Sequence, residues 1–386
     1  MINPEETQFS RTNPFIAKIK ERKRLSKIGS KKSTHYISLD ISGSNIHYNV
    51  GDSIGIYPIN DPQLIEWTLK AMNATGDELV TDKHGENSRP LKVFLKEKAN
   101  ITEFSKNFLK EIAKKQNDPI KKAKLESFFL EDQKEALKEF LLAYELWHVL
   151  EENKEAAFEI QELCNLLMPL LPRLYSISSS KNAVGNEVHL TVAMLEYESN
   201  QLLRRGVCTH YLCNLAPLND PVVPIYIHPH NGFTIPENEN TPMIMIGPGT
   251  GIAPFRAFLQ ERMHKQSKGK NWLIFGEWNR NFDFFYEDYW NELVASDQLR
   301  LHSAFSRDEA HKVYVQHRML ENGQEIFDWL QNGAHFYVCG DAKRMARDVE
   351  ATLLQIISEF GKLDEVEAKA YLKELRVNKR YLRDVY

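Results

Sequence analysis

The chain has 386 residues, of which 42% are hydrophobic and 26% are charged, and its formal net charge is −4. This length is typical of two or three globular domains with their own cores, and the charge gives no general attraction for nucleic acid. The longest apolar runs are too short to cross a bilayer, and the N-terminus lacks the pattern of a signal peptide. We therefore expect a cytoplasmic protein with no membrane and no nucleic-acid partner.

The four cysteines lie far apart in the sequence, at Cys164, Cys208, Cys213 and Cys339. No CxxC pair is present, so the spacing argues against both a disulfide framework and a zinc site. We expect free thiols, a reducing compartment and no bound metal.

A basic stretch at residues 16–33 holds eight Lys or Arg residues that alternate with Ile and Leu. The simplest interpretation is the solvated face of a strand. A second interpretation is a docking surface for an acidic protein. Binding to nucleic acid is the least favoured of the three interpretations, because no aromatic residues lie between the charges to stack on bases.

The N-terminal part predicts an antiparallel barrel or sandwich that is interrupted by helices. Alternating residues and Gly or Pro turns indicate strands between residues 15 and 57. Asp61 can then cap a helix, Pro62 suits its first turn, Gly76 should end it, and one apolar stripe runs along it: Ile65, Leu69, Met72. This helical insertion continues to about residue 170, and a stripe with helical spacing indicates core: Phe140, Tyr144, Trp147.

Strand character returns after residue 173, followed by a short helical piece at residues 206–215 and a closing strand and linker at residues 221–242. Strands at residues 243–247, 271–277, 299–306 and 334–340 then alternate with helices, which is typical of a parallel sheet covered by crossover helices. Loops after such strands gather at one sheet edge, where we expect a cofactor cleft.

The first of these strands leads into a glycine turn, GPGTGIAP, at residues 247–254. We interpret Gly247, Gly249 and Gly251 as positions without a Cβ where the backbone approaches a phosphate, with the Thr250 hydroxyl among them. The spacing is GxGxG, so it matches neither GxGxxG nor a P-loop. A glycine turn with a purely structural role is the alternative.

Four segments stand in a characteristic order: RLYS at residues 173–176, GVCT at 206–209, the glycine turn at 247–254, and YVCGD at 337–341. Here the chain resembles the flavin reductase module shared by ferredoxin-NADP reductases, cytochrome P450 reductase and the flavoprotein subunit of NADPH-sulfite reductase. The likeness runs from about residue 15 to residue 386 and includes SRDEAHKVYVQ at residues 306–316. The ending YLRDVY is most like the sulfite reductase flavoprotein (alpha) subunit, and the helical insertion marks the diflavin branch.

The resemblance implies a two-domain β plus α/β fold. An antiparallel FAD-binding barrel would span residues 12–235, with the helical insertion at about 61–170. A parallel-sheet NADP-binding α/β domain would span residues 236–386.

The resemblance also implies the residues that contact FAD. The RLYS segment would provide a cation for a phosphate, a ring beside the isoalloxazine and a hydroxyl near a flavin nitrogen. The alternative interpretation is an edge strand whose alternate residues face water. GVCT resembles a diphosphate loop. The expected FAD residues are Arg173, Leu174, Tyr175, Ser176, Thr191, Ala193, Tyr197, Gly206, Val207, Cys208, Thr209 and Tyr386.

NADPH is expected instead of NADH because residues 306–316 provide cations and hydroxyls, which a 2′-phosphate needs, whereas a free ribose usually meets an acid. A solvated surface turn is the alternative. The expected NADP residues are Gly249, Thr250, Ser306, Arg307, Lys312, Val313, Tyr314, Val315, Gln316 and Asp348.

The catalytic residues implied by the resemblance are Ser176, Cys339 and Asp384. Cys339 would lie beside the carbon that gives up hydride, although from the sequence alone it could be a small core residue. Ser176 and Asp384 would align and polarise the transfer. Tyr386 would cover the flavin face where nicotinamide docks, and would therefore have to move.

Relatives in the diflavin branch carry an FMN-binding flavodoxin domain ahead of this module, and no such domain precedes residue 15 here. Either the chain is a fragment or the FMN carrier is a separate protein. We expect an NADPH-dependent flavoprotein oxidoreductase that passes electrons through FAD to an FMN carrier, a flavodoxin or a sulfite reductase haem subunit, for sulfite reduction and cysteine biosynthesis. The alternatives are a reductase for a free flavodoxin or ferredoxin, and a nucleotide-binding scaffold without turnover.

Overall fold

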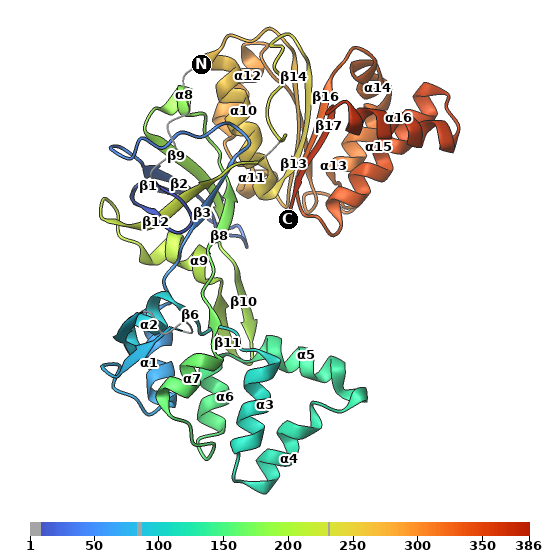
Figure 1. Ribbon diagram of the computed structural model, residues 1–386. Helices are drawn as coiled ribbons and strands as arrows, with labels where there is room; N and C mark the ends of the chain where they lie inside the picture. The colour runs from blue at the N-terminus through green and yellow to red at the C-terminus, as the bar shows by residue number, and fades with distance from the viewer. Residues whose placement is uncertain (1–8, 83–86, 231) are drawn as a thin grey trace. The chain divides into compact units, whose positions relative to one another are not determined.

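The computed structural model describes residues 9–82, 87–230 and 232–386 (Figure 1). Residues 1–8, which bear on the signal-peptide argument, lie outside the described residues. The chain forms two compact units. The two-sheet unit comprises Met1–Gly55, Leu174–Ala193 and Pro217–Tyr386, and the helical unit comprises Ile56–Arg173 and Met194–Ala216.

The first sheet of the two-sheet unit is an antiparallel barrel of six strands in the order β8-β3-β12-β1-β2-β9. Their bounds are β1 (Phe15–Arg24), β2 (Thr34–Asp40), β3 (Ser53–Ile56), β8 (Arg173–Ser176), β9 (Glu187–Ala193) and β12 (Pro221–His228). A bridge between Ile177 and Leu190 joins the two edge strands, which closes the barrel. Its interior is apolar and fully buried: Ala17, Ile19, Ile37, Leu39, Val188, Leu190, Val192, Val223 and Ile225. The short helix α8 (Lys181–Val184) precedes β9.

Strand β1 explains the basic stretch. Ala17 and Ile19 point into the barrel, so the cations at the positions that alternate with them face outward. Several cations of residues 16–33 have acidic partners: Lys20 with Glu187, Lys23 with Glu21, Lys27 with Glu287, and Lys32 with Glu277. These pairs favour the solvated strand face and weaken the case for a docking surface for an acidic protein.

The second sheet is parallel, with five strands in the order β15-β14-β13-β16-β17. The strands are β13 (Met243–Pro248), β14 (Asn271–Glu277), β15 (Arg300–Phe305), β16 (His335–Gly340) and β17 (Tyr381–Val385). The strand predictions for β13 to β16 are confirmed, whereas β17 was not predicted. Seven helices belong to this part: α10 (Ala253–His264), α11 (Arg280–Asp283), α12 (Glu287–Ala295), α13 (Val315–Glu321), α14 (Gly323–Gln331), α15 (Met345–Gly361) and α16 (Glu365–Val377).

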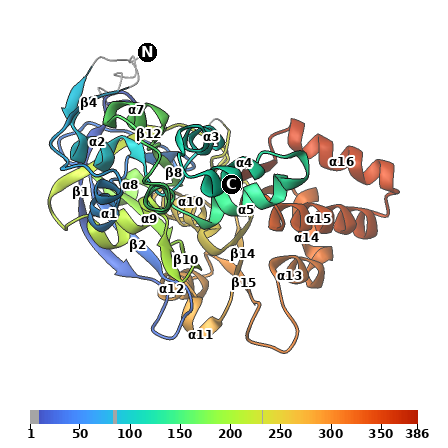
Figure 2. The same ribbon diagram turned by 90° about the horizontal axis from the view of Figure 1, so that it is seen from below.

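Both faces of the parallel sheet are covered. Ile244 and Ile246 of β13 pack into one core with residues of α13 to α16. Met243 and Met245 pack into another core with residues of α10 and α12. Figures 1 and 2 show these two helix groups on opposite sides of the strands. The predicted combination of an antiparallel barrel and a parallel α/β sheet is therefore confirmed.

The helical unit is built around one apolar core. Its helices are α1 (Pro62–Ala71), α2 (Leu91–Glu97), α3 (Lys106–Lys115), α4 (Pro119–Ser127), α5 (Lys134–Ala143), α6 (Leu146–Glu152), α7 (Ile160–Leu166) and α9 (Val207–His210), with the turns η1 (Glu131–Gln133) and η2 (Tyr211–Leu215, a π-helix). Short strands pair within it: β4 (Leu79–Thr81) with β5 (Ser88–Pro90), β6 (Ala99–Asn100) with β7 (Met168–Pro169), and β10 (Glu196–Ser199) with β11 (Leu202–Arg205).

Helix α1 has the predicted start but a different end. Asp61 is the N-cap, and its side chain accepts a hydrogen bond from the Gln63 amide at 2.8 Å. The helix ends at Ala71, before Gly76, because Asn73 takes a left-handed conformation with φ 52°. Asparagine tolerates this conformation better than most residues, so the chain turns there.

The aromatic stripe of Phe140, Tyr144 and Trp147 does not lie on one helix, which corrects the prediction. Helix α5 ends at Ala143 and α6 begins at Leu146. Phe140 and Tyr144 pack against the core, as expected, while Trp147 stacks on His148 with ring centroids 3.5 Å apart.

The hairpin of β10 and β11 explains the break between α5 and α6. Side chains of Ser199, Asn200 and Arg204 all donate to the carbonyl of Ala143, at 3.1, 2.8 and 3.2 Å. A carbonyl at a helix end has no partner within the helix, so the hairpin satisfies it. Arg204 also forms a buried ion pair with Glu145, their side chains being 5% and 9% exposed.

We expect Glu145→Ala to lower the free energy of unfolding of the helical unit by about 3–5 kcal/mol, because it leaves a buried arginine unpaired. Hydrogen exchange of α5 and α6 during urea unfolding measures this unit selectively. Glu151→Ala is the matched control, since Glu151 pairs with Lys154 at the surface and should cost less than about 1 kcal/mol. Equal losses in the two variants would contradict the role of the buried pair.

Candidate functional site

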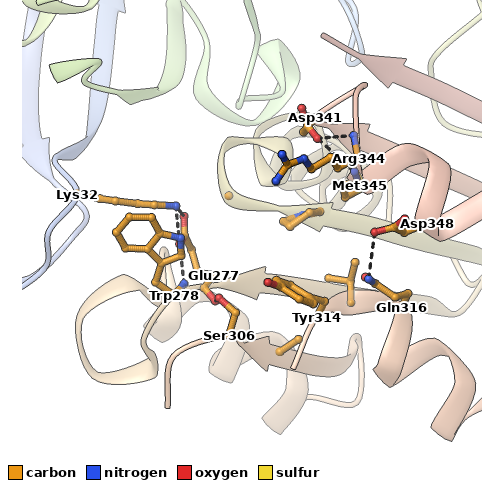
Figure 3. Close-up of a pocket in the computed structure, with 15 residues that line it drawn as sticks. Lys32, Glu277, Trp278, Ser306, Tyr314, Gln316, Asp341, Arg344, Met345 and Asp348 are labelled. Carbon is orange, nitrogen blue, oxygen red and sulfur yellow. Dashed lines mark hydrogen bonds and ion pairs between the residues drawn. The ribbon is translucent and has the colours of Figure 1, made fainter. Parts of the chain in front are cut away.

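A pocket of about 490 Å³ lies at the carboxyl ends of the parallel strands (Figure 3). The pocket is lined by Lys32, Pro248, Gly249, Gly276, Glu277, Trp278, Ala304, Ser306, Tyr314, Val315, Gln316, Asp341, Arg344, Met345 and Asp348. The chain runs from β13 outward to β14 and β15, and then returns to the other side with β16 and β17. Open α/β sheets bind ligands at such a reversal of strand order, so the pocket is where a nucleotide is expected.

The glycine turn at the end of β13 makes close contacts inside the protein, as well as bordering the pocket. A Cβ on Gly251 would lie 2.1 Å from the Cys339 carbonyl oxygen, and one on Gly247 would lie 2.6 Å from the Phe255 ring. Gly249 has φ 59°, a left-handed conformation. Two glycines are therefore required by packing and one by its backbone angle, and only Gly249 also lines the pocket.

Six of the residues expected to contact NADP line this pocket: Gly249, Ser306, Tyr314, Val315, Gln316 and Asp348. Gln316 donates to Asp348 at 3.3 Å, so the structure brings these two together. Arg307 and Lys312 are exposed and lie outside the lining residues. The side chain of Val313 is in the core, and the Thr250 hydroxyl lies 3.0 Å from that of Tyr386.

Nine lining residues are not among those expected to contact NADP: Lys32, Pro248, Gly276, Glu277, Trp278, Ala304, Asp341, Arg344 and Met345. Lys32 reaches from the loop before β2 to the end of β14, where its ammonium contacts both carboxylate oxygens of Glu277, at 2.7 and 2.8 Å. Burial raises the pKa of Glu277, while Lys32 opposes that shift. Asp341 caps α15 by accepting from the Arg344 and Met345 amides. Glu277 ends one predicted strand and Asp341 directly follows another, and this position in the sequence could have identified both as pocket residues.

The three expected catalytic residues lie together in the two-sheet unit. Ser176, at the end of β8, donates to the Asp384 carboxylate at 2.8 Å. Cys339 and Asp384 are paired in register on β16 and β17, and the Cys339 sulfur lies 3.8 Å from the same carboxylate oxygen. Burial raises the pKa of the Cys339 thiol well above its usual range, and the negative charge of Asp384 adds to this shift.

Tyr386 continues β17 alongside the end of β16. Its amide donates to the Gly340 carbonyl and its carbonyl accepts from the Ala342 amide, both at 3.1 Å. The side chain is 62% exposed and its hydroxyl contacts Thr250. The backbone is thus fixed, so any movement of Tyr386 to admit a ligand would be made by the ring.

The expected FAD residues of the two-sheet unit differ in accessibility. Leu174 is 51% exposed, and Tyr175 and Ser176 are half-buried. Thr191 is buried and its hydroxyl lies 2.7 Å from that of Tyr286, so it has an internal partner. Ala193, at the end of β9, is exposed.

The other expected FAD residues belong to the helical unit. Arg173 and Tyr197 are exposed, Val207 is half-buried and Cys208 is buried. A Cβ on Gly206 would lie 2.9 Å from the Thr209 hydroxyl, so this turn requires glycine. That hydroxyl donates to the Gly206 carbonyl and accepts from the Leu195 amide, so it stabilises the turn.

The chemistry of these side chains fits the two groups that the sequence implies. The RLYS strand carries a guanidinium, an aromatic ring and a hydroxyl, which suit a flavin dinucleotide. The pocket offers the Arg344 cation, the Ser306 hydroxyl and the Tyr314 ring, which suit a second dinucleotide. In the described part of the chain, no group of three His, Cys, Asp or Glu residues could hold a metal ion.

The fold and the site define a protein that binds a flavin through a barrel and a nicotinamide dinucleotide through a parallel sheet. A family model described as "FAD binding domain" matches residues 7–211, and one described as "Oxidoreductase NAD-binding domain" matches residues 245–351. The chain belongs to the FAD binding domain family, and the resemblance to the flavin reductase module is confirmed.

Curated relatives named "Sulfite reductase [NADPH] flavoprotein alpha-component" are similar to this chain over almost its whole length. The protein of Bacillus subtilis is 40% identical over 382 residues, and that of Shewanella oneidensis is 40% identical over 385 residues, each match covering 99% of this chain. The chain spans 62% of the length of both relatives. Among the helices of residues 9–82, 87–230 and 232–386, none has the length and apolar character that a membrane span needs.

The buried cysteines provide a test of the site. All four are buried, and burial raises the pKa of Cys164 to about 12 and also raises that of Cys339 well above its usual range. Because the thiolate is the reactive form, iodoacetamide at pH 8 should label these residues far more slowly in the folded protein than in urea. Peptide mass mapping identifies each labelled site.

Asp384→Asn removes the charge that helps to raise the Cys339 pKa, so it should increase the labelling of Cys339 but not that of Cys164. Equal changes at both cysteines would indicate general loosening of the fold. Fast labelling of Cys339 in the unaltered protein would contradict its environment as described.

Proposed function

We propose that this chain is an NADPH-dependent FAD reductase that passes electrons to a separate acceptor. The hydrogen bond between Ser176 and Asp384 is the observation that carries the proposal, because it brings the end of a barrel strand to the end of a parallel strand. Each sheet belongs to a domain type that binds one of the two cofactors.

FAD, when bound, would supply the redox chemistry, since it can accept two electrons as hydride and release them singly. The residues of the chain would position the reactants and exclude water. Ser176 would present its hydroxyl oxygen to the flavin as a hydrogen-bond acceptor, because its single proton is donated to Asp384, which fixes the orientation of the hydroxyl. Cys339 would stay a neutral thiol at neutral pH, which provides an uncharged surface beside the reacting carbon.

The pocket at the parallel sheet would hold the NADPH. Ser306, Tyr314 and Gln316 line its rim, with Arg307 and Lys312 nearby in the sequence. These groups suit a phosphate on the adenosine ribose. Tyr386 would cover the flavin until nicotinamide displaces its ring.

We propose that the acceptor belongs to a sulfite reductase system, because relatives that are 40% identical to this chain carry that name. A haem subunit, an FMN carrier or a flavodoxin could receive the electrons, for conversion of sulfite to sulfide in cysteine biosynthesis in the cytoplasm. In this proposal residues 12–235, with the insertion at about 61–170, bind FAD and residues 236–386 bind NADPH.

The test is to supply the purified chain with FAD, record its absorbance spectrum and measure NADPH oxidation with ferricyanide. We expect a stable yellow complex and turnover, and then transfer to a sulfite reductase haem subunit when an FMN carrier is added. A chain that stays colourless with FAD would refute the proposal. Turnover with flavodoxin alone would favour the alternative acceptor.

Arg307→Ala should raise the KM for NADPH about ten- to hundredfold and leave the KM for NADH nearly unchanged. The physical reason is the loss of charge-assisted hydrogen bonds to the phosphate, which are worth about 1.5–3 kcal/mol. Steady-state kinetics with both dinucleotides measures the difference. Arg347→Ala is a control because Arg347 is exposed and does not line the pocket. Equal changes for NADPH and NADH would remove Arg307 from phosphate selection.

A further inference from the structure

The indole of Trp278 lies beneath two cations at the rim of the pocket. The guanidinium carbon of Arg307 is 3.2 Å from the ring centroid, and the Lys32 ammonium is 4.5 Å from it. Figure 3 shows Trp278 beside Lys32 and Glu277, at the side of the pocket where Ser306 lies. Trp278 is half-buried, so the cations are only partly screened by water.

The backbone holds this arrangement in place. The Arg307 amide donates to the Trp278 carbonyl at 2.8 Å, and the Ser306 amide donates to the Glu277 carbonyl at 2.9 Å. The loop after β15 is therefore attached to the end of β14. Asn279 adds to this attachment because its side chain donates to the Arg307 carbonyl at 3.2 Å.

Glu277 contacts both the backbone of Trp278 and the Lys32 cation. Its carboxylate accepts from the Trp278 amide at 2.7 Å and forms the ion pair with Lys32. The charge of Lys32 is thus largely balanced inside the pocket. No carboxylate of the described residues forms an ion pair with Arg307, and the indole face takes that place.

We propose that Trp278 is a specificity-determining positioning residue that holds Arg307 ready for a phosphate monoester on the adenosine ribose. This inference rests on the proposed function. A guanidinium stacked on a ring keeps its N–H groups in the plane, pointing away from the ring, where they can donate to phosphate oxygens in pairs. Stacking also restricts a long side chain before the ligand arrives, which reduces the entropy lost on binding.

The experiment is calorimetric titration of the full chain, loaded with FAD, with adenosine 2′,5′-bisphosphate and with adenosine 5′-monophosphate. Trp278→Leu should weaken binding of the bisphosphate about two- to fivefold and leave the monophosphate nearly unchanged, as the strength of exposed cation–π contacts implies. Trp278→Phe keeps an aromatic face and should retain most of the bisphosphate affinity.

A double-mutant cycle separates positioning from general support of the pocket. In the Arg307→Ala background, Trp278→Leu should have no further effect on the bisphosphate, because the side chain that it positions is gone. Arg280→Ala is the matched control, since Arg280 lies over Phe284 and not over Trp278. It should bind both ligands like the unaltered chain.

Three results would overturn the role of Trp278 while the proposed function stands: full bisphosphate affinity in Trp278→Leu, equal losses for both ligands, or additive losses in the cycle. An unaltered chain that fails to prefer the bisphosphate would overturn both proposals together. If Trp278→Leu does not fold, as judged by circular dichroism, Trp278→Met, which also lacks an aromatic face, takes its place in the cycle with Arg307→Ala, and fully additive losses there refute the coupling.

Discussion

The carboxylate of Asp384 is the point at which the two sheets of the two-sheet unit meet chemically. It accepts from Ser176 of the barrel and lies beside Cys339 of the parallel sheet. The position depends on β17, since pairing with β16 sets Asp384 directly opposite Cys339. A shift of one residue in that register would turn the carboxylate to the other face of the sheet. The site therefore depends on β17, which is also an edge strand of the parallel sheet.

The glycine turn supports the same arrangement from the other side. Gly251 rests against the Cys339 carbonyl, so β13 and β16 approach closely just where the strand order reverses. Any larger residue there would separate the turn from the end of β16 and so displace Cys339 and Gly340. Packing inside the protein therefore accounts for Gly247 and Gly251 of the glycine turn, and the same packing shapes the adjoining pocket.

Strands β13, β14 and β16 could be predicted because each carries a continuous apolar run between helical patterns and is buried on both faces, whereas β15 is buried only at Ala304 and Phe305. Strand β17 could not, because Tyr381–Val385 is short, carries Arg383 and Asp384, and lies at an edge. The expectation that residues 176, 339 and 384 act together came only from the resemblance, since they are far apart in sequence. Lys32 could not be predicted as a pocket residue for a similar reason, because only folding brings the basic loop before β2 to the end of β14.

The rim of the pocket shows why counting charges is a poor guide to ligand choice. Residues 16–33 hold many cations, yet Lys20, Lys27 and Lys32 each have an acidic partner. What distinguishes Arg307 is its support, an indole face and a backbone attachment to β14, with no carboxylate to displace. A phosphate can therefore engage Arg307 without first breaking an ion pair, whereas at Lys32 it would compete with Glu277. Selection for a phosphorylated ribose would then arise from Arg307, a cation that has no carboxylate partner among the described residues and that the Trp278 indole holds in place.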